Sequence, residues 1–313
     1  MLRKGVGYLV LLTALLLLGW YVSAHFDDFM PLLDISPAYV GLILVASLVY
    51  VCLQGALYNS VLGACGVRLP FTEALGTVVL TLFGNYFFPF AGFGFRGIYL
   101  KRVYGVALKD YSITIVALVF VELLVYAVFG FIALSLLNVL EGISDITLFA
   151  FFTLASSGCL LAFATKVPFI SGIKFLRPIN SLLESWYAFR KNRAILRRLV
   201  GLTILQFIAY SSLFLLAFGA IDIGISLSES ALHAALSDFG FLFKVAPAGI
   251  GTYEALVLYT VNLTQHTISE GVMIVLLVRA ATIIWPLILA PICIPRFTKK
   301  MQVEKFSELV TPE

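Results

Sequence analysis

The chain is short of charge. Asp, Glu, Lys and Arg make up 12% of its 313 residues, whereas 61% of the residues are hydrophobic. A soluble domain carries about 25% charged residues, so this chain has only about half the usual share. That shortage excludes a water-soluble domain, a disordered chain and a nucleic-acid-binding protein. The long apolar runs must instead be explained as segments that cross a bilayer.

Residues that build metal sites are also scarce. The three histidines are scattered along the chain, and the four cysteines lie in or beside apolar stretches without the spacing of metal ligands. We interpret the cysteines as small packing residues. The sequence therefore predicts neither a metal site nor a cofactor. A soluble catalytic domain is excluded as well, because the longest polar segment has about thirty residues.

Six apolar runs are long enough to cross a hydrocarbon core about 30 Å thick. The end of the first run, Val22-Ser23-Ala24, is compatible with signal-peptidase cleavage. We expect a retained helix, because the run is long and further spans follow. The six runs cover residues 6–24, 38–63, 111–140, 147–165, 199–220 and 271–294.

Charge divides the connecting segments into two groups. Acids but no Lys or Arg occur near residues 25–37, 138–146, 221–230 and 262–270. Nineteen of the 21 Lys and Arg residues lie in segments 3–4, 68, 96–109, 166–198 and 296–305. Because Lys and Arg collect in cytoplasmic loops, the basic segments and both chain termini are predicted to be cytoplasmic.

Two further apolar stretches contain clusters of Pro and Gly. The stretch 72–95 lies between basic segments and is too short for two spans, which predicts a re-entrant hairpin that enters from the cytoplasm. The stretch 231–261 lies between acidic loops, which predicts a hairpin from the opposite side, although two ordinary crossings remain an alternative there. The predicted fold is thus an all-α polytopic membrane protein with six transmembrane helices and two opposed re-entrant hairpins. Residues 1–300 form one integral membrane domain, and residues 301–313 form a short cytoplasmic tail.

The two hairpins have similar spacing, which indicates an inverted repeat. Pro89 precedes Arg96 by seven residues, and Pro247 precedes Glu254 by seven. A charge inside the next span follows after 26 residues in the first half, at Glu122, and after 25 in the second, at Arg279. Inverted repeats with broken helices that meet near the midplane are typical of secondary transporters.

Broken helices at that depth need polar surroundings. Pro and Gly leave backbone groups that lipid cannot satisfy, so irregular backbone must face protein or a wet cavity. Buried charges are costly in a bilayer and mark functional paths. The predicted translocation path consists of Asn85, Pro89, Gly92, Gly94, Arg96, Glu122, Lys244, Pro247, Gly249, Gly251, Glu254 and Arg279.

Purely structural roles remain open for the charged residues. Glu122 and Arg279 could form an architectural ion pair. Arg96 could be a topology anchor, because it begins a run that continues with Lys101 and Arg102.

Structural roles also remain open for other members of the path. The glycines could serve close helix packing, and Asn85 could cap a broken helix. Lys244 could reach toward the headgroups or pair with Asp238.

The segment 166–198 combines a basic composition with one apolar face. It holds eight Lys or Arg residues and one acid, Glu184. Ile179, Leu182, Leu183 and Trp186 recur at helical spacing. This pattern predicts an amphipathic helix on anionic headgroups, and a topology signal without lipid specificity is the alternative.

The pattern resembles the transmembrane (flippase) domain of bacterial lysylphosphatidylglycerol synthases and related stand-alone membrane proteins. The resemblance covers residues 40–295. The residues that carry it are Asn85, Pro89, Gly92, Gly94 and Arg96, then Tyr99-Leu100-Lys101-Arg102, Glu122, Pro247, Gly249, Gly251, Glu254 and Arg279.

The resemblance implies lipid translocation in a prokaryotic cytoplasmic membrane. It does not imply lipid aminoacylation, because the aminoacyl-transfer domain of the full-length synthases has no counterpart in this sequence. Two departures are Ala248, where members commonly carry Gly, and Phe95, in a region where many carry an acid. The implied partners are anionic or phosphate-bearing membrane lipids, and a second copy or a separate lipid-modifying enzyme.

Three functions are therefore weighed. The first is a flippase for a phospholipid, an aminoacyl-phospholipid or a polyprenyl-phosphate lipid, with a Phe-rich lining between the hairpins. In this hypothesis Arg96, alone or together with Arg279, attracts the phosphate, and Glu122 and Glu254 balance the arginines or contact a cationic part of the headgroup. The second is a transporter or channel for a small polar solute or ion. The third, an intramembrane enzyme, is disfavoured because Glu122 and Glu254 have no accompanying nucleophile or metal motif. The lining phenylalanines are Phe83, Phe87, Phe88, Phe90 and Phe93.

Overall fold

The computed structural model describes residues 16, 19–21, 23–87, 91–164, 189, 192–242 and 249–310. Within these ranges the regular structure is entirely helical, which confirms the all-α prediction. The short 3₁₀ helices are η1 (Phe26–Leu32) and η2 (Gly63–Cys65). The α-helices are α2 (Pro37–Leu62), α3 (Phe71–Phe87), α4 (Ala91–Tyr104), α5 (Leu108–Glu141), α6 (Ile146–Ala164), α8 (Arg193–Ala220), α9 (Leu227–Leu242), α10 (Thr252–Leu263) and α11 (Ile268–Val310).

Four of the described helices are long and apolar enough to cross a membrane. These segments are Pro37–Cys65, Leu108–Glu141, Arg193–Ala220 and Ile268–Gln302. Each coincides with one of the predicted runs. The run 147–165 corresponds to α6, whose apolar part Ile146–Leu161 is shorter. Most of the run 6–24 lies outside the described residues, as does segment 166–198 up to the start of α8, apart from Phe189 and Asn192.

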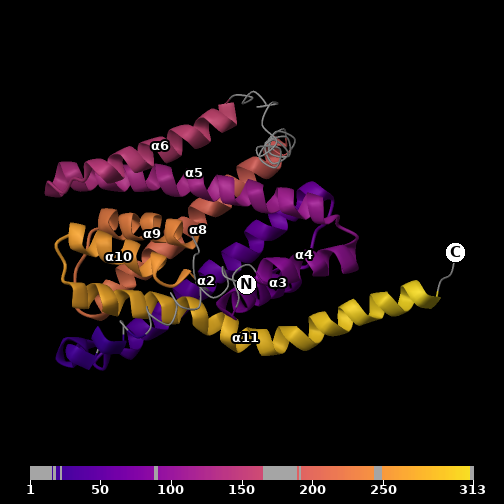
Figure 1. Ribbon diagram of the computed structural model, residues 1–313, viewed down its shortest axis with the longest axis horizontal. Helices are drawn as coiled ribbons and strands as arrows, with labels where there is room; N and C mark the ends of the chain where they lie inside the picture. Colours follow the sequence, from indigo (N-terminus) through magenta and orange to yellow (C-terminus); the bar gives the residue numbers. More distant parts are fainter. Residues whose placement is uncertain are drawn as a thin grey trace.

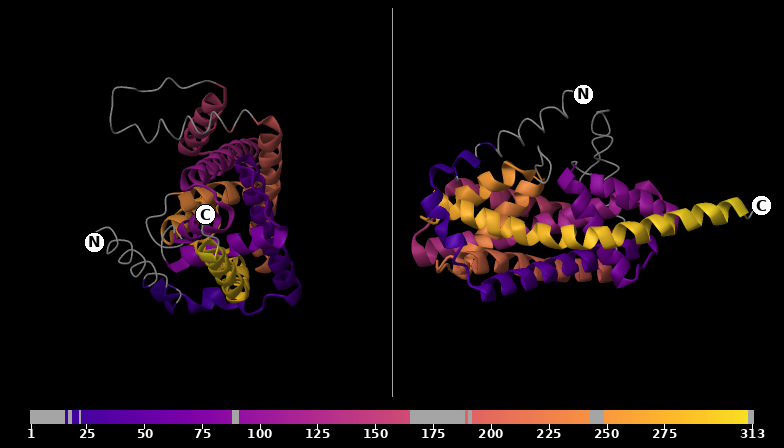
Figure 2. Two further views of the ribbon diagram at one scale, coloured as in Figure 1. Left: turned by 90° about the vertical axis from the view of Figure 1, so that its right-hand side faces the viewer. Right: turned by 90° about the horizontal axis from the view of Figure 1, so that it is seen from below.

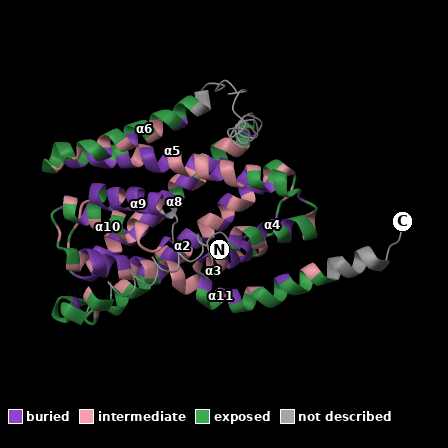
Figure 3. Cartoon of the chain, in the orientation of Figure 1, coloured by how far each residue is buried: buried purple, intermediate pink, exposed green. Residues whose placement is uncertain are grey.

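The long helices α2, α5, α8 and α11 lie side by side along one bundle (Figures 1 and 2). Figure 3 shows buried positions concentrated inside the bundle and exposed positions along α6. Many exposed side chains on α6 are large and apolar, for example Ile146 at 87% and Leu154 at 73% exposure. Apolar surface on this scale suits contact with lipid chains.

Local sequence sets where the long helices begin, end and bend. Pro37 occupies the first turn of α2, and the Ser36 hydroxyl accepts a hydrogen bond from the Ala38 amide, as expected for a helix start. Gly142 ends α5 with φ of 70°, a conformation that glycine adopts without strain. Three prolines lie inside α11, and that helix bends along its course in Figure 1.

The four shorter helices form two antiparallel pairs, α3 with α4 and α9 with α10. A Cβ atom on Gly92 would lie 1.9 Å from the carbonyl oxygen of Thr81, and one on Gly240 would lie 2.8 Å from the Cα atom of Tyr253. Glycine therefore permits both close crossings, as in other membrane helix pairs. The two pairs occupy opposite ends of the bundle (Figure 1).

Candidate functional site

A cavity of about 340 Å³ lies where α3 and α4 meet the helices around them. We call it the central cavity. It is lined from α2, α3, α4, α5, α8, α9 and α11, so both helix pairs contribute to it. Its polar lining residues are Tyr50, Gln54, Tyr58, Thr81, Asn85, Tyr86, Arg96, Glu122, Gln206, Tyr210, Asp238 and Thr282.

Arg96 is the buried cation of the central cavity. Its side chain is 1% exposed. The Nε and Nη2 groups donate to the hydroxyl of Thr81, at 3.0 and 2.6 Å. The guanidinium carbon lies 3.6 Å from the centre of the Tyr58 ring, close enough for a cation–π contact. Among the residues described, Nη1 has no hydrogen-bond partner, and no acid forms an ion pair with Arg96.

The crossing of α3 and α4 fixes the position of Arg96. Thr81 lies on α3, and its carbonyl is the group against which Gly92 packs. The Asn85 side chain accepts a hydrogen bond from the Gly92 amide at 3.0 Å. Asn85 therefore bonds the start of α4 and also lines the cavity. Because Arg96 lies one turn beyond Gly92, the crossing turns its guanidinium toward Thr81.

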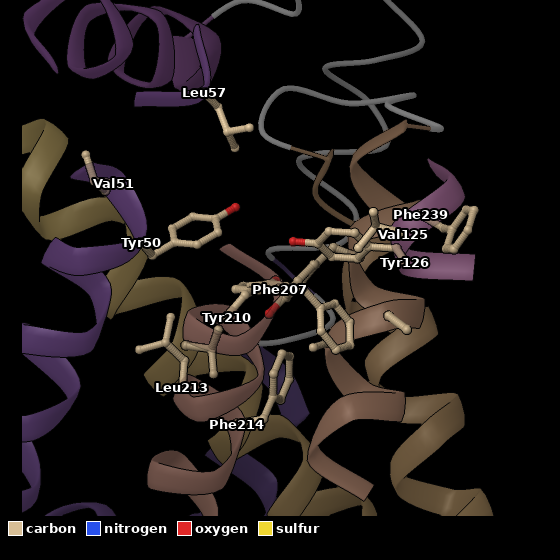
Figure 4. Close-up of a cluster of buried hydrophobic side chains, with 14 of the residues drawn as sticks. Tyr50, Val51, Leu57, Val125, Tyr126, Phe207, Tyr210, Leu213, Phe214 and Phe239 are labelled. Carbon is tan, nitrogen blue, oxygen red and sulfur yellow. The ribbon is translucent and has the colours of Figure 1, made fainter. Parts of the chain in front are cut away.

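A wall of tyrosines closes the side of the cavity formed by α2 and α8. Tyr50 and Tyr210 stack with ring centres 5.1 Å apart. Gln54 donates to the Tyr50 hydroxyl at 3.0 Å. Figure 4 shows the hydroxyls of Tyr50 and Tyr126 pointing toward one another, and no described group bonds the Tyr126 hydroxyl. Tyr126 belongs to α5 and is not among the lining residues of the cavity. Since buried hydroxyls normally have partners, its hydroxyl is suited to bond a buried water.

Two acids balance Arg96 across the cavity. Glu122 comes from the middle of α5 and Asp238 from α9, and both are half-buried. The described lining residues of the cavity therefore include one cationic and two anionic side chains, within a largely apolar bundle. Such a set could hold a ligand that carries charges of both signs.

The second helix pair holds its charge differently. Gly249 and Gly251 have φ of 69° and 92°, which permits the turn into α10. Glu254 accepts a hydrogen bond from the Gly251 amide at 2.7 Å and forms an ion pair with Arg279 of α11. Arg279 also lies 4.6 Å from the centre of the Tyr253 ring. The pair is largely buried, with 13% and 21% of the Arg279 and Glu254 side chains exposed.

The predicted path residues thus fall into two groups. Arg96, Glu122 and Asn85 line the central cavity, whereas Glu254 and Arg279 form a separate pair. The groups are linked through Thr282, whose carbonyl accepts from Tyr86 at 3.4 Å and whose hydroxyl donates to the Arg279 carbonyl at 3.0 Å. Pro89, Lys244 and Pro247 lie outside the described residues, as do Phe88 and Phe90.

Several structural alternatives can now be compared with the geometry. Arg96 is buried while Lys101 and Arg102 are exposed, so it is not a topology anchor at the bundle surface. Arg279 forms an ion pair with Glu254, a different partner from Glu122, which the sequence had suggested. Gly92 is packed against α3, whereas a Cβ on Gly94 would meet no described atom within 4 Å.

Sequence reasoning missed part of the cavity wall. For Asp238 the sequence suggested only a pairing with Lys244. Four further polar residues that line the cavity were not predicted to belong to the path: Tyr50, Gln54, Tyr58 and Gln206. The available signal was polar side chains inside apolar runs, which are costly unless they face a polar space.

The chain is similar to known proteins at the level of a family. None of the curated proteins compared with the chain matches it. Residues 6–290 match the family described as the lysylphosphatidylglycerol synthase TM region. The match spans most of the chain, including both helix pairs and every lining residue of the central cavity. The chain therefore belongs to the family of the lysylphosphatidylglycerol synthase transmembrane region.

Proposed function

We propose that this protein moves a phosphate-bearing lipid between the leaflets of a membrane. The observation that carries the proposal is Arg96: a buried guanidinium on the wall of the central cavity, with an Nη1 group that has no hydrogen-bond partner among the described residues. A phosphate oxygen is a strong acceptor for such a donor. Membership of a lipid-related membrane family supports the same substrate class.

In the proposed membrane topology, α3–α4 and α9–α10 are re-entrant hairpins between six spans. The end of the bundle with Arg68, Lys101, Arg102 and Arg198 faces the cytoplasm, together with both chain termini. The opposite end carries Asp27, Asp145, Asp222 and Glu270. Single cysteines that replace Arg102 or Asp145, in a variant without native cysteines, should react with an impermeant reagent from opposite sides. Labelling of both from one side would refute this topology.

The substrate headgroup would occupy the central cavity while its chains remain in the bilayer. Arg96 would bind the phosphate, and Glu122 and Asp238 would accept hydrogen bonds from hydroxyl or cationic groups of the headgroup. Phe93 and the apolar residues of α5 would contact the first carbons of the chains. No bond is made or broken in this step, so the proposed activity is transport and not enzymatic catalysis.

Leaflet exchange in liposomes tests the proposal. The protein is reconstituted, and transfer of a fluorescent phospholipid is followed with a reductant that cannot cross the bilayer. A charge-assisted hydrogen bond is worth about 1.5–3 kcal/mol, so Arg96→Gln should slow transfer at least about tenfold. Lys101→Gln, on the exposed side of the same helix, is the matched control and should transfer normally. Wild-type transfer by Arg96→Gln would remove Arg96 from the proposed mechanism.

A transporter for a small polar solute is the second candidate. It is favoured by the cavity volume of about 340 Å³, which falls in the range of small-molecule sites, and by the charged side chains of Arg96, Glu122 and Asp238 on the cavity wall. Flux of a water-soluble zwitterion without leaflet exchange, abolished by Arg96→Gln, would establish this function in place of lipid transfer.

A further inference from the structure

A second cavity, of about 420 Å³, has a set of lining residues different from that of the central cavity. It is located between the last turn of α2, the loop before α3 and the first turns of α8. We call it the basic-end cavity, because two arginines, Arg68 and Arg198, line it and no acid is among its described lining residues. Both arginines are exposed, and neither forms an ion pair with a described acid. Two cations facing one hollow repel each other unless an anion lies between them.

The loop that carries Arg68 is held rigidly. Asn59 donates to the Leu69 carbonyl at 2.8 Å and accepts from the Leu69 amide at 2.9 Å. Gly66 turns the chain with φ of 75°. The backbone next to Arg68 is thereby fixed against the side of α2, so Arg68 is presented to the cavity from an ordered position.

The opposite wall adds positive potential. Ala194 and Ile195 belong to the first turn of α8 and line the cavity. A helix N-terminus carries about half a positive charge and favours anions. Asn192 caps this turn through the Ile195 amide, which fixes its orientation, and Arg198 follows on the same helix.

An unpartnered hydroxyl completes the lining. Ser60 is 6% exposed, and its hydroxyl has no hydrogen-bond partner in the described part of the chain, although serine hydroxyls inside helices usually bond a carbonyl of the preceding turn. It lies on the cavity wall together with the two arginines. A hydroxyl can donate to an anion, and its lack of a partner points to a ligand that supplies the acceptor.

From this geometry we infer that the basic-end cavity binds a phosphate group. Two guanidinium groups, a helix N-terminus and a hydroxyl donor match a group with several acceptor oxygens and negative charge. The phosphate comes from the headgroup of an anionic lipid or from free phosphate in solution. The site is distinct from the central cavity, because Tyr58 faces the central cavity while the next two residues of α2 line this one.

Ligand-induced stabilisation of the purified protein tests the site. The probes are inorganic phosphate and a short-chain phosphatidylglycerol, with a zwitterionic short-chain lipid as the reference. The variants are Arg68→Gln, Arg198→Gln and the double variant. Arg197→Gln is the matched control, because Arg197 bonds the Arg193 carbonyl and does not line the cavity. We expect each single variant to bind about tenfold more weakly and Arg197→Gln to bind as the wild type does.

The two phosphate sources give different results. Stabilisation by phosphatidylglycerol alone assigns the site to a lipid headgroup, and equal stabilisation by inorganic phosphate assigns it to a soluble phosphate. Stabilisation by neither probe, or undiminished stabilisation of the double variant, overturns the inference. Arg68→Lys with Arg198→Lys preserves the charge and checks for misfolding: this variant should retain weakened binding. Every variant is built on Arg96→Gln, with Arg96→Gln itself as the reference, so that the proposed phosphate site of the central cavity does not contribute to the stabilisation. Because transport is not measured, failure of this test would leave the proposed lipid transfer untouched.

Discussion

The two helix pairs use the same backbone device but opposite charge arrangements. Each has a glycine crossing and a charge seven residues after a proline. In the first pair, Arg96 bonds the neutral hydroxyl of Thr81 and lines a cavity. In the second, Glu254 is ion-paired with Arg279 and bonded to the Gly251 amide. In the first pair the cation keeps a donor without a partner among the described residues, which is what the proposed function requires. In the second pair the charges are joined to each other and connect α10 with α11.

The two pairs are alike at their outer ends, where each is held by hydrogen bonds to another part of the bundle. At the basic end, Glu73 of α3 accepts hydrogen bonds from Tyr104 at 2.6 Å and from Lys300 of α11 at 2.8 Å. At the other end, Tyr259 of α10 donates to Asp145 in the loop between α5 and α6. Each pair is thus anchored at its outer end, and of the described residues only those of the first pair place a cavity-lining cation at the inner end. Substitution of Glu254 or Arg279 should therefore lower mainly the stability of the protein, whereas substitution of Arg96 should weaken mainly ligand binding.

The largest effect is expected from Gly92→Ala. The added Cβ would lie 1.9 Å from a backbone carbonyl, which cannot move aside as a flexible side chain can. The crossing of α3 and α4 must separate, at a cost of about 3 kcal/mol or more. Thermal unfolding in detergent measures this loss. Gly94→Ala is the control, because a Cβ there meets no described atom within 4 Å, and alanine favours a helix by up to about 1 kcal/mol. Equal melting temperatures for the two variants would contradict the close crossing at Gly92.

Loss of the Glu254–Arg279 ion pair should cause the next largest loss of stability. Glu254→Gln or Arg279→Gln leaves one charge without its partner. Because 13% and 21% of the Arg279 and Glu254 side chains remain exposed, the cost should be near the lower end for buried pairs, about 3 kcal/mol. The double variant removes both charges and should recover much of the loss. A double-mutant cycle on thermal stability checks this coupling. If Arg96→Gln destabilises the protein as much as Arg279→Gln does, the two halves do not differ as described.

Removal of the Thr81 hydroxyl should act on binding more than on stability. Thr81→Val keeps the side-chain shape but removes the acceptor for Nε and Nη2 of Arg96. The guanidinium then loses its orientation, and we expect lipid transfer to fall about tenfold. Thr81→Ser keeps the hydroxyl and should retain most of the activity. Transfer assays and melting curves on the same preparations separate the two effects, and a valine variant as active as the serine variant would contradict the positioning role.

The sequence was sufficient for the features that depend on short stretches of chain. Apolar runs predicted the four long helices, because a span must be continuously apolar. The Pro and Gly clusters marked where α3 ends and where α9 gives way to α10. Glu122 and Arg96 stood out because charge inside an apolar run is costly.

The features that were missed depend on how helices rotate against one another. The spacing of seven residues between proline and charge places Arg96 and Glu254 at matching positions. The spacing does not determine which partner each side chain contacts. The sequence analysis assigned these two residues, with Glu122 and Arg279, to one translocation path. The close approach at Gly92 turns Arg96 onto Thr81, whereas the cap at Gly251 turns Glu254 toward Arg279. Asp238 and the tyrosines joined the cavity through packing between helices distant in sequence, which no local pattern encodes.

The smallest predicted effect concerns the outer contact of the second pair. The hydrogen bond from Tyr259, with those from the amides of Leu148 and Thr147, lowers the pKa of Asp145 below its ordinary value. A lowered pKa means that the folded state favours the carboxylate, so this contribution is complete above the ordinary pKa of about 4 and is lost as pH falls through the lowered value. Asp145→Asn keeps an oxygen that can accept from the two amides but removes the negative charge at the start of α6. It should remove that part of the acid sensitivity and cost about 0.3–1 kcal/mol at neutral pH. Melting temperatures between pH 7 and pH 3 measure it, with Asp222→Asn as the control: parallel curves for the Asp145 variant and the wild type would show that Tyr259 does not anchor α10 through this carboxylate.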